Sequence, residues 1–206
     1  APSRDEAEAL LKALGFPFDR GRFDDSDHAL TEGVPGDMRI TTKYELKDPF
    51  QGLLGTLHET GQALYDLGLP SEWVDPPVGQ DRGMALEESQ SLLFEMIVGR
   101  SRAFVTYLRP LLEKHYGAAG PEWSEDNLYR RLNRVMRGTN RMDADELTYQ
   151  THIWMRYELE RRLLSGELAV KDLRDAWNSL SSDRLGLVPA TDLEGVLQDI
   201  HWAIGS

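Results

Sequence analysis

The residues with the clearest potential for chemistry form the segment His58-Glu59-Thr60-Gly61-Gln62. Positions i and i+4 of a helix share one face, so two histidines at that spacing can bind one metal ion, and a Glu beside the first can act as a general base. Here the second position is Gln62, whose neutral amide is a weaker zinc ligand than imidazole. The segment is half of a metal-binding motif, and the alternative is an ordinary His-Glu pair on a packed or exposed helix face.

Two adjacent carboxylates, Glu87 and Glu88, lie near the start of the next predicted helix. A zinc site built on a two-His helix commonly takes a carboxylate from a following helix as its third ligand. The alternative explanation is that both residues complement the macrodipole in the first helical turn. Residue types alone leave both explanations open.

The elements that would hold these groups follow from the periodicity of the sequence. Residues 37–47 alternate in polarity and predict a strand, which could pair with part of the loop expected at 16–36. Asp48 then predicts a helix N-cap, Pro49 suits the first helical position, and Gly68 suits the end of the helix. The half-motif would therefore lie in the middle of this helix.

Most of the remaining chain is predicted to be helical, apart from a proline-containing loop at residues 69–82. The expected helices are 4–14, 84–116 with an interruption near Pro110, 124–136, 143–165, 170–180 and 191–204. The fold class predicted from these patterns is mainly α, with one small β element.

The composition limits the kinds of site that the chain can carry. Its 206 residues are 40% hydrophobic and 28% charged, which is typical of a globular protein. The sequence contains no cysteine, so it has no disulfides, thiolate zinc sites or cysteine nucleophiles. Any metal ion would have to be bound by His, carboxylate or amide groups.

The charge and hydropathy of the chain disfavour two classes of partner. A formal net charge of −12 repels nucleic-acid phosphates and anionic membrane surfaces, and the Arg-rich stretch at 130–141 is best explained as a solvated helix face or internal ion pairs. No apolar run approaches the ~20 residues of a membrane span, and residues 1–8 do not resemble a signal peptide. We therefore expect a cytoplasmic protein that binds neither nucleic acid nor membrane.

A series of short motifs extends along nearly the whole chain. They are Asp19–Asp24 followed by His28, Asp37–Thr41, His58–Gln62, Glu87–Gln90, Gly99–Ser101, Asn140–Asp145 and Gly195–Trp202. In this order they resemble the motifs of the carboxypeptidase Taq family of metallocarboxypeptidases. The sequence departs from the family pattern at Gln62 and at Glu87, where the family has histidines, and His28 is not followed by the family's Pro-Phe.

The resemblance implies a zincin-like helical metallopeptidase core and a metal site. The implied ligands are His58 and Glu88, with Gln62 at the degenerate ligand position and Glu87 as a possible substitute ligand. The implied cofactor is a divalent metal, with zinc favoured and cobalt or manganese as alternatives. Replacement of a ligand histidine should weaken metal binding, so the site could also be without metal.

The resemblance further assigns roles in catalysis and substrate binding. Glu59 would act as general base, and His201 would help to stabilise the oxyanion. Arg39 or Arg141 would bind the terminal carboxylate of a peptide substrate, because guanidinium suits bidentate contact with carboxylate. The alternative for both arginines is an ion pair with a nearby aspartate.

The same resemblance leads to two hypotheses for function. Residues 1–206 would form a single domain that corresponds to the central metal-site portion of the family, without the flanking regions. The first hypothesis is a metal-dependent carboxypeptidase-like protein whose activity is impaired by Gln62. The second is an inactive, truncated homologue that serves as a peptide-binding or assembly module. We also expect a homodimer, because apolar faces that relatives cover would otherwise be exposed.

Overall fold

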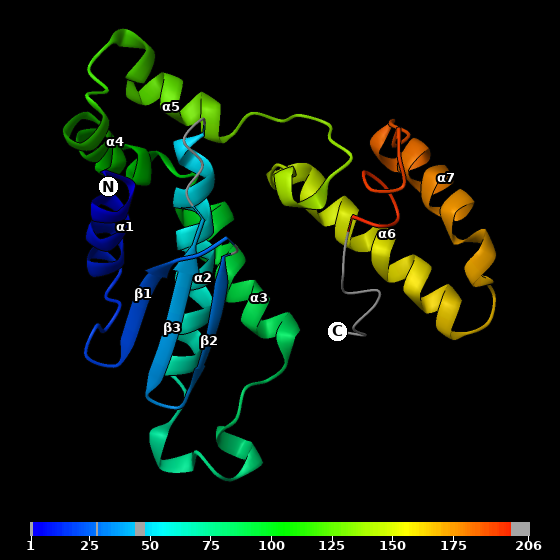
Figure 1. Ribbon diagram of the computed structural model, residues 1–206, viewed down its shortest axis with the longest axis horizontal. Coiled ribbons are helices and arrows are strands. Elements are labelled where there is room, and N and C mark those ends of the chain that lie inside the picture. The colour runs from blue at the N-terminus through cyan, green and yellow to red at the C-terminus, as the bar shows by residue number, and fades with distance from the viewer. Residues whose placement is uncertain (1, 28, 44–47, 199–206) are drawn as a thin grey trace. The chain divides into compact units, whose positions relative to one another are not determined.

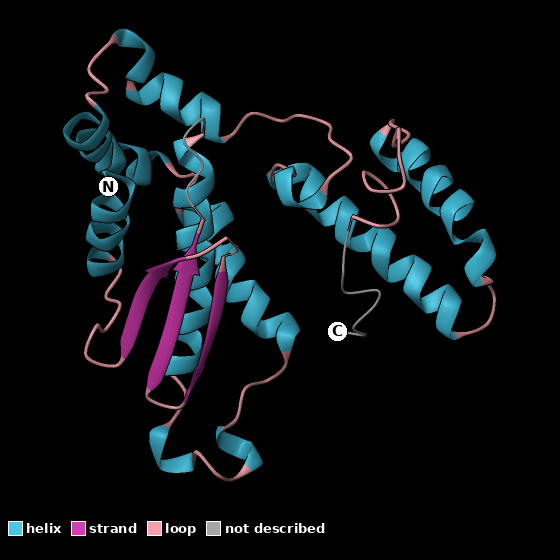
Figure 2. Cartoon of the chain, viewed as in Figure 1, coloured by secondary structure: helices cyan, strands magenta, loops and turns pink. Residues whose placement is uncertain are grey.

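The computed structural model describes residues 2–27, 29–43 and 48–198 (Figure 1). The chain divides into two compact units, residues 1–132 and 133–206, and each unit is described by itself. That the whole chain acts as a single domain stays a prediction. Figure 2 shows helices as the main element and three strands in the first unit, so the predicted fold class, mainly α with one small β element, is confirmed.

The sheet of the first unit has the strand order β1-β3-β2. Its strands are β1 (Gly21–Asp25), β2 (Leu30–Val34) and β3 (Asp37–Thr42), with β3 parallel to β1 and antiparallel to β2. The loop expected at 16–36 is therefore wrong, since it contains two strands. Both are edge strands, and β2 is almost entirely exposed, so neither shows the clear alternation that identifies a half-buried strand.

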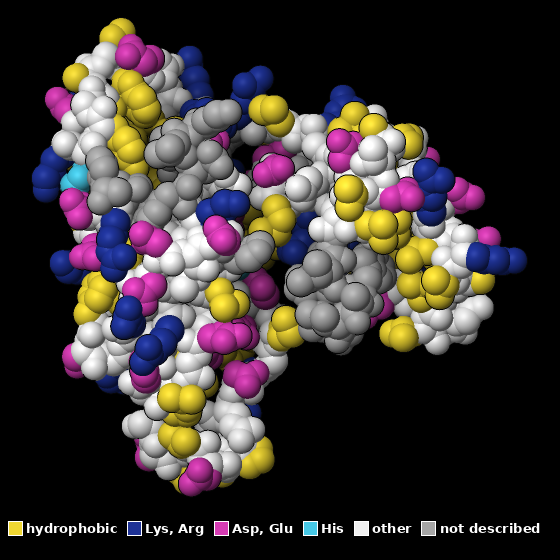
Figure 3. Space-filling model, viewed as in Figure 1, with side chains coloured by type: hydrophobic (Ala, Val, Ile, Leu, Met, Phe, Trp, Pro, Cys, Tyr) yellow, Lys and Arg dark blue, Asp and Glu magenta, His cyan; other side chains and the backbone are white. Residues whose placement is uncertain are grey.

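Strand β3 shows the predicted alternation. Met38, Ile40 and Thr42 are buried, whereas Arg39 between them is exposed. The strand is confirmed over Asp37–Thr42, and the rest of the prediction includes residues 44–47, which lie outside the described residues. In Figure 3, Lys and Arg side chains and Asp and Glu side chains are interspersed over the viewed face of this unit.

Helix α2 (Pro49–Leu67) begins and ends where the sequence predicts. The Asp48 side chain caps it by accepting a hydrogen bond of 3.1 Å from the backbone N–H of Phe50. At the other end the N–H of Gly68 donates to the carbonyls of Leu64 and Tyr65. Helix α1 (Pro2–Ala13) likewise confirms the helix expected at 4–14.

The long helical stretch expected at 84–116 is interrupted, but not at Pro110. It consists of α3 (Met84–Leu92), a π-helical segment η3 (Leu93–Val98) and α4 (Arg102–Tyr116). Pro110 lies inside α4 on its exposed side, where water can hydrate the carbonyl that loses its partner. The break comes before α4, where the Ser101 side chain accepts a hydrogen bond from the N–H of Phe104 as N-cap.

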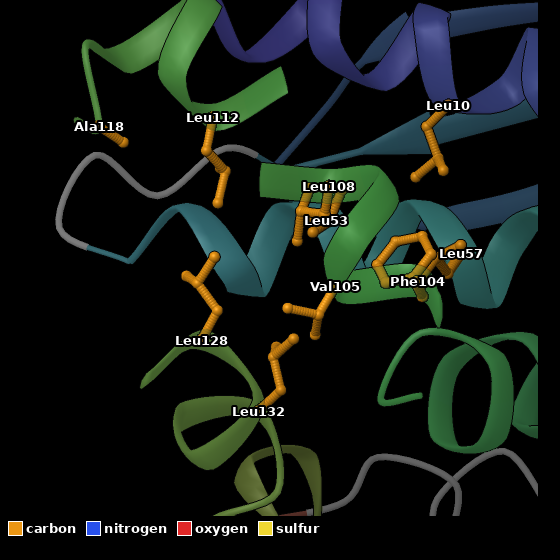
Figure 4. Packing of buried hydrophobic residues seen from close by; sticks show 10 residues of the cluster. All are labelled: Leu10, Leu53, Leu57, Phe104, Val105, Leu108, Leu112, Ala118, Leu128 and Leu132. Carbon is orange, nitrogen blue, oxygen red and sulfur yellow. The ribbon is translucent and has the colours of Figure 1, made fainter. Parts of the chain in front are cut away.

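The largest hydrophobic cluster lies where four helices of the first unit meet (Figure 4). Its buried members are Leu10, Leu53, Leu57, Phe104, Val105, Leu108, Leu112, Ala118, Leu128 and Leu132. They come from α1, α2, α4 and α5 (Glu125–Leu132), together with the segment after α4. A second cluster joins α1 and α2 to the inner face of the sheet. Helix α2 thus packs in both clusters and is held on several sides.

The second unit is helical around a smaller core. Its main elements are η5 (Arg141–Asp143), α6 (Glu146–Leu164), η6 (Val170–Asp172) and α7 (Leu173–Leu185). Leu159 of α6 and Trp177 of α7 belong to its buried cluster. The helix expected at 191–204 is wrong over 191–198, which form turns, and its remainder lies outside the described residues. Within the described ranges, no helix is long and apolar enough to span a membrane.

The contact between α2 and α3 depends on the absence of a side chain at Gly61. A Cβ atom built there would lie 2.6 Å from both the carbonyl oxygen of Gln90 and the Cα of Ser91. Gly99 is a second such position, since its Cβ would lie 2.5 Å from Cδ1 of Leu57. These glycines let α2 approach α3 and η3 closely.

We predict that Gly61→Ala destabilises the first unit by about 1–3 kcal/mol, because the added methyl group must push two backbones apart. The matched control is Gly55→Ala in the same helix, where the nearest atom would be 3.8 Å away. That control should be neutral or stabilising by up to about 1 kcal/mol through helix propensity. Urea unfolding of both variants measures the difference, and equal effects would contradict the close-contact explanation.

Candidate metal centre

The imidazole of His58 is held between two carboxylates. Its Nδ1 lies 2.9 Å from Oε2 of Glu95, and its Nε2 lies 3.4 Å from Oε2 of Glu88. His58 comes from α2, Glu88 from α3 and Glu95 from η3. The His58 side chain is 21% exposed, so the ring is partly buried where it contacts the two carboxylates.

The helix geometry explains why both carboxylates reach one ring. Glu88 and Glu95 are seven residues apart, and Glu95 lies in the π-helical segment η3, where each turn is wider than in an α-helix. The close approach at Gly61 brings α3 against α2. His58 then spans the space between the two carboxylates, with one ring nitrogen toward each.

The amide of Gln62 lies beside the same ring. Its Nε2 is 3.5 Å from Nε2 of His58 and 3.4 Å from Oε1 of Glu88. The i, i+4 spacing therefore does place Gln62 and His58 together, as the half-motif predicts. A half-turn of the amide would present its oxygen, the ligand atom of a carboxamide, to the same space.

The three groups fit a divalent cation, with two strong ligands and one weak one. Nε2 of His58 and Oε2 of Glu88 are 3.4 Å apart, and two ligands bound tetrahedrally at zinc distances would be separated by about 3.4 Å. The amide of Gln62 supplies a third, weaker donor. Within the described part of the chain, no group of three His, Cys, Asp or Glu side chains has metal-binding spacing.

The carboxyl of Glu59 is buried and bonded to the sheet. Its Oε2 accepts a hydrogen bond of 2.6 Å from Oγ1 of Thr31 on β2, and the same hydroxyl lies 3.0 Å from the Glu59 carbonyl. Burial raises the pKa of Glu59 above 4.5, whereas the Thr31 hydrogen bond and the neighbouring His58 lower it. A buried carboxyl with a raised pKa is suited to exchanging protons.

The two carboxylates make His58 a strong base. Burial lowers its pKa, but the hydrogen bonds to Glu88 and Glu95 outweigh this effect and raise the pKa to about 10. The raised pKa means that the stabilisation from the protonated ring is complete below about pH 6.5 and is lost as the pH rises through about 10. A cation bound to Nε2 must displace a proton.

The other proposed ligand, Glu87, lies in a different electrostatic environment. Burial raises its pKa, and the nearby charges of Asp66, Glu88 and Asp81 raise it further. Its neighbourhood thus includes acidic groups of α2 and of the loop before α3. Its role as a substitute ligand stays a prediction.

The predicted substrate-binding arginines lie in separate units. Arg39 projects from β3 on the face opposite the buried Met38 and Ile40, and its Nη2 donates a hydrogen bond of 2.8 Å to Asp37. Arg141, in the second unit, donates its backbone N–H to Gln198 and its Nη1 to the hydroxyl of Tyr149. The ion pair considered for Arg39 is therefore present at the surface. His201 lies outside the described residues.

Sequence reasoning missed two residues around this centre, Thr31 and Glu95, and it gave no role to Arg100, which belongs to the motif Gly99–Ser101. The spacing of seven residues from Glu88 could have identified Glu95, since it places both carboxylates on one helix face. Nothing in the pattern could have found Thr31, because it lies in a segment expected to be a loop.

Comparison with known proteins agrees with this architecture. A His-Glu pair on one helix beside a carboxylate on the next is an arrangement that helical metallopeptidases use. A family model described as carboxypeptidase Taq (M32) metallopeptidase matches residues 2–206. The chain is 41% identical over 198 residues to thermostable carboxypeptidase 1 of Thermus thermophilus and 38% identical over 197 residues to carboxypeptidase 1 of Bacillus subtilis.

Solved structures of carboxypeptidases also match this chain over nearly its whole length. Metallocarboxypeptidase 1 of Trypanosoma cruzi superimposes with a TM-score of 0.94 at 38% identity, and an M32 carboxypeptidase of Deinococcus radiodurans with 0.89 at 40% identity. These matches cover 99% and 98% of this chain but 42% and 41% of theirs. The curated relatives are matched over 95% of this chain and 38–39% of their own length. The chain belongs to the carboxypeptidase Taq family of metallopeptidases and spans about two fifths of the relatives' length.

We predict that Thr31→Val raises the pKa of Glu59 further and costs about 1–3 kcal/mol at pH 8. The removed hydroxyl bonds to the charged carboxylate, so the cost should shrink at pH 4, where Glu59 is protonated in both folded and unfolded states. Urea unfolding at the two pH values checks this.

The control for this prediction is Thr106→Val. Its hydroxyl lies 3.0 Å from Glu125, but both residues are exposed, so the loss should stay within about 0.5 kcal/mol. A loss for Thr31→Val that is equal at both pH values would show that packing, and not the carboxylate, is responsible.

Proposed function

We propose that this chain carries the metal site of a carboxypeptidase-like peptide hydrolase that removes C-terminal residues from peptides. The observation that supports this most is the meeting of His58, Glu88 and Gln62 at one point, with the buried carboxyl of Glu59 on the same helix. Family membership supplies the reaction class.

Three residues have separate proposed roles in the reaction, namely His58, Glu88 and Glu59. His58 and Glu88 would hold a divalent cation, which polarises a scissile carbonyl and lowers the pKa of a water molecule. Glu59 would accept a proton from the attacking water and pass it to the leaving amine. The raised pKa of Glu59 favours acceptance of the proton, because the protonated carboxyl is less costly in a buried position.

The Gln62 amide should weaken cation binding and alter its selectivity. Loss of an imidazole leaves two strong protein ligands, and removal of a group outside the ligand shell already costs 10–100-fold in affinity. Carbonyl-type oxygens suit harder cations such as manganese, whereas imidazole suits zinc. We propose zinc as the first candidate, because His58 and Glu88 are ligand types that zinc accepts, with manganese or cobalt as alternatives.

Substrate recognition is proposed to use guanidinium groups. Arg39 is exposed and engaged by a single residue of its own strand, Asp37, an arrangement that a substrate carboxylate could replace by a bidentate contact. Arg141 is partly buried, and His201 retains its proposed role toward the oxyanion. Each assignment rests on the family resemblance together with the chemistry of the side chain.

A second candidate function is an inactive homologue that binds a peptide or a partner subunit. It is favoured by the incomplete ligand set at Gln62 and by the apolar residues exposed along α3 and η3, including Leu86, Leu93 and Ile97. Exposed apolar stripes of this kind are commonly buried by association. On the same basis we propose a homodimer, which light scattering would test directly.

We predict that Gln62→His increases zinc affinity by at least about 10–100-fold, because it restores a second imidazole on the face of His58. Metal content after purification without chelator, and titration calorimetry of the stripped protein, measure the change. The matched control is Gln51→His, at an exposed position of the same helix, which should leave the affinity unchanged. Metal bound by neither the parent protein nor Gln62→His would sink the proposal and favour the inactive homologue.

For the reaction itself we predict that Glu59→Gln lowers peptide cleavage by roughly 10²–10⁴-fold, because the general base is lost. The assay uses N-blocked peptides with a free C-terminal residue and metal-loaded protein. Metal content should be unchanged in this variant, which separates loss of the base from loss of the cation. Equal cleavage by Glu59→Gln and the parent would exclude Glu59 from the role.

A further inference from the structure

The proposed reaction leaves the closest polar contact of His58 without a role. Nδ1 of the imidazole lies 2.9 Å from Oε2 of Glu95, closer than Nε2 lies to Glu88 or Gln62. Glu95 belongs to none of the motifs that carry the family resemblance, and it would face the ring on the side away from a bound cation.

We propose that Glu95, anchored by Arg100, is a positioning residue that holds the His58 ring and its Nδ1 proton, so that Nε2, which faces Glu88 and Gln62, is the nitrogen that gives up its proton to a cation. The inference rests on the proposed function in one respect, namely that the orientation of Nε2 matters when a cation is bound there. We call the contact of Glu95 with Nδ1 of His58, supported by Arg100, the clamp.

The anchoring group is the guanidinium of Arg100. Its Nη2 lies 3.8 Å from Oε1 of Glu95, and its Nη1 donates a hydrogen bond of 2.7 Å to the carbonyl of Leu132. The Arg100 side chain is 9% exposed and that of Glu95 is 18% exposed, so neither moves freely in solvent. Leu132 ends α5 and is buried in the largest cluster, so the chain of contacts runs from the core to the ring.

When the ring loses one of its two protons, the clamp selects one of two imidazole tautomers. If the proton resided on Nε2, that nitrogen would donate to Glu88 and would have no lone pair for a cation. A carboxylate accepting from Nδ1–H favours the opposite arrangement, and it also increases the basicity of the ligand nitrogen. The 2.9 Å contact at Nδ1 against 3.4 Å at Nε2 agrees with this preference.

Arg100 also distinguishes the two carboxylates that flank the ring. Glu95 lies against a buried positive charge, which makes it an anchored acceptor and a poor ligand for a second cation. Glu88 is 41% exposed and bonded to the hydroxyl of Ser91, so it lies on the open side where a cation can enter. The two glutamates therefore have different roles: Glu95 positions the ring, and Glu88 faces the position of the cation.

The π-helical segment η3 contains Glu95. Such widened turns change where a side chain lies relative to the preceding helix and are frequent at functional sites. Gly99, directly after η3, packs against Leu57 of α2. This contact holds the widened turn against the helix that carries His58.

The test compares Glu95→Gln and Glu95→Asp with the parent protein by two measurements. One is the metal dissociation constant, obtained by competition with a chelator. The other is the exchange rate of the His58 Nδ1–H proton, followed by NMR in metal-free protein and assigned by its loss in His58→Ala. The matched control is Glu113→Gln, which removes an exposed partner of Arg109.

We expect Glu95→Gln to weaken metal binding about 10–100-fold and to accelerate exchange of the Nδ1 proton, with unchanged circular dichroism. Glu95→Asp keeps the charge and should recover part of both effects, whereas Glu113→Gln should change neither. Unchanged affinity together with unchanged proton exchange in Glu95→Gln would overturn the clamp. If that variant does not fold, the absence of a slowly exchanging Nδ1 proton in the parent would overturn it instead.

These outcomes are distinguishable from failure of the proposed function. A parent protein that takes up no zinc, manganese or cobalt would refute the metal-dependent activity. The proton-exchange measurement in that same metal-free protein would still decide whether Glu95 holds the ring.

Discussion

The close approach of α2 to α3 and η3 is the constraint on which the rest of the first unit depends. Gly61 and Gly99 leave no side chain between these helices, so the His58 ring can reach Glu88 of α3 and Glu95 of η3. A wider separation would break both contacts at once, because charge-assisted hydrogen bonds weaken steeply beyond normal distances. The side chains can therefore form the site only because the backbones of these helices pack closely.

When no cation is bound, a proton on His58 supplies the positive charge between the carboxylates of Glu88 and Glu95. Two carboxylates around a partly buried imidazole raise the pKa of His58 to about 10, so the protonated ring takes the position of the positive charge. Cation binding must remove that proton, which couples affinity to pH. The amide of Gln62 adds nothing to this coupling, because it neither carries nor releases a proton.

The rigidity of the site comes from its place between two hydrophobic clusters. Leu53 and Leu57 of α2 pack against α4 and α5, whereas Ala63 of the same helix packs toward the sheet. Thr31 connects the sheet to Glu59, and Arg100 connects α5 to Glu95. The carboxyl of Glu59 is thus held by a contact from the sheet, and that of Glu95 by a contact that leads to α5. Functional groups held in this way keep their geometry when they react.

Residue types and spacing were enough to predict helix α2 with its Asp48 cap, the alternation of β3, the mainly α fold class and the likeness to the carboxypeptidase Taq family. These features depend on local rules, which act over a few residues along the chain. The two edge strands, the break at 99–101 and the roles of Thr31, Glu95 and Arg100 depend on contacts between segments distant in sequence. Only tertiary packing decided them, because the energy of a buried hydrogen bond or ion pair depends on what the fold brings opposite it and not on the residues beside it.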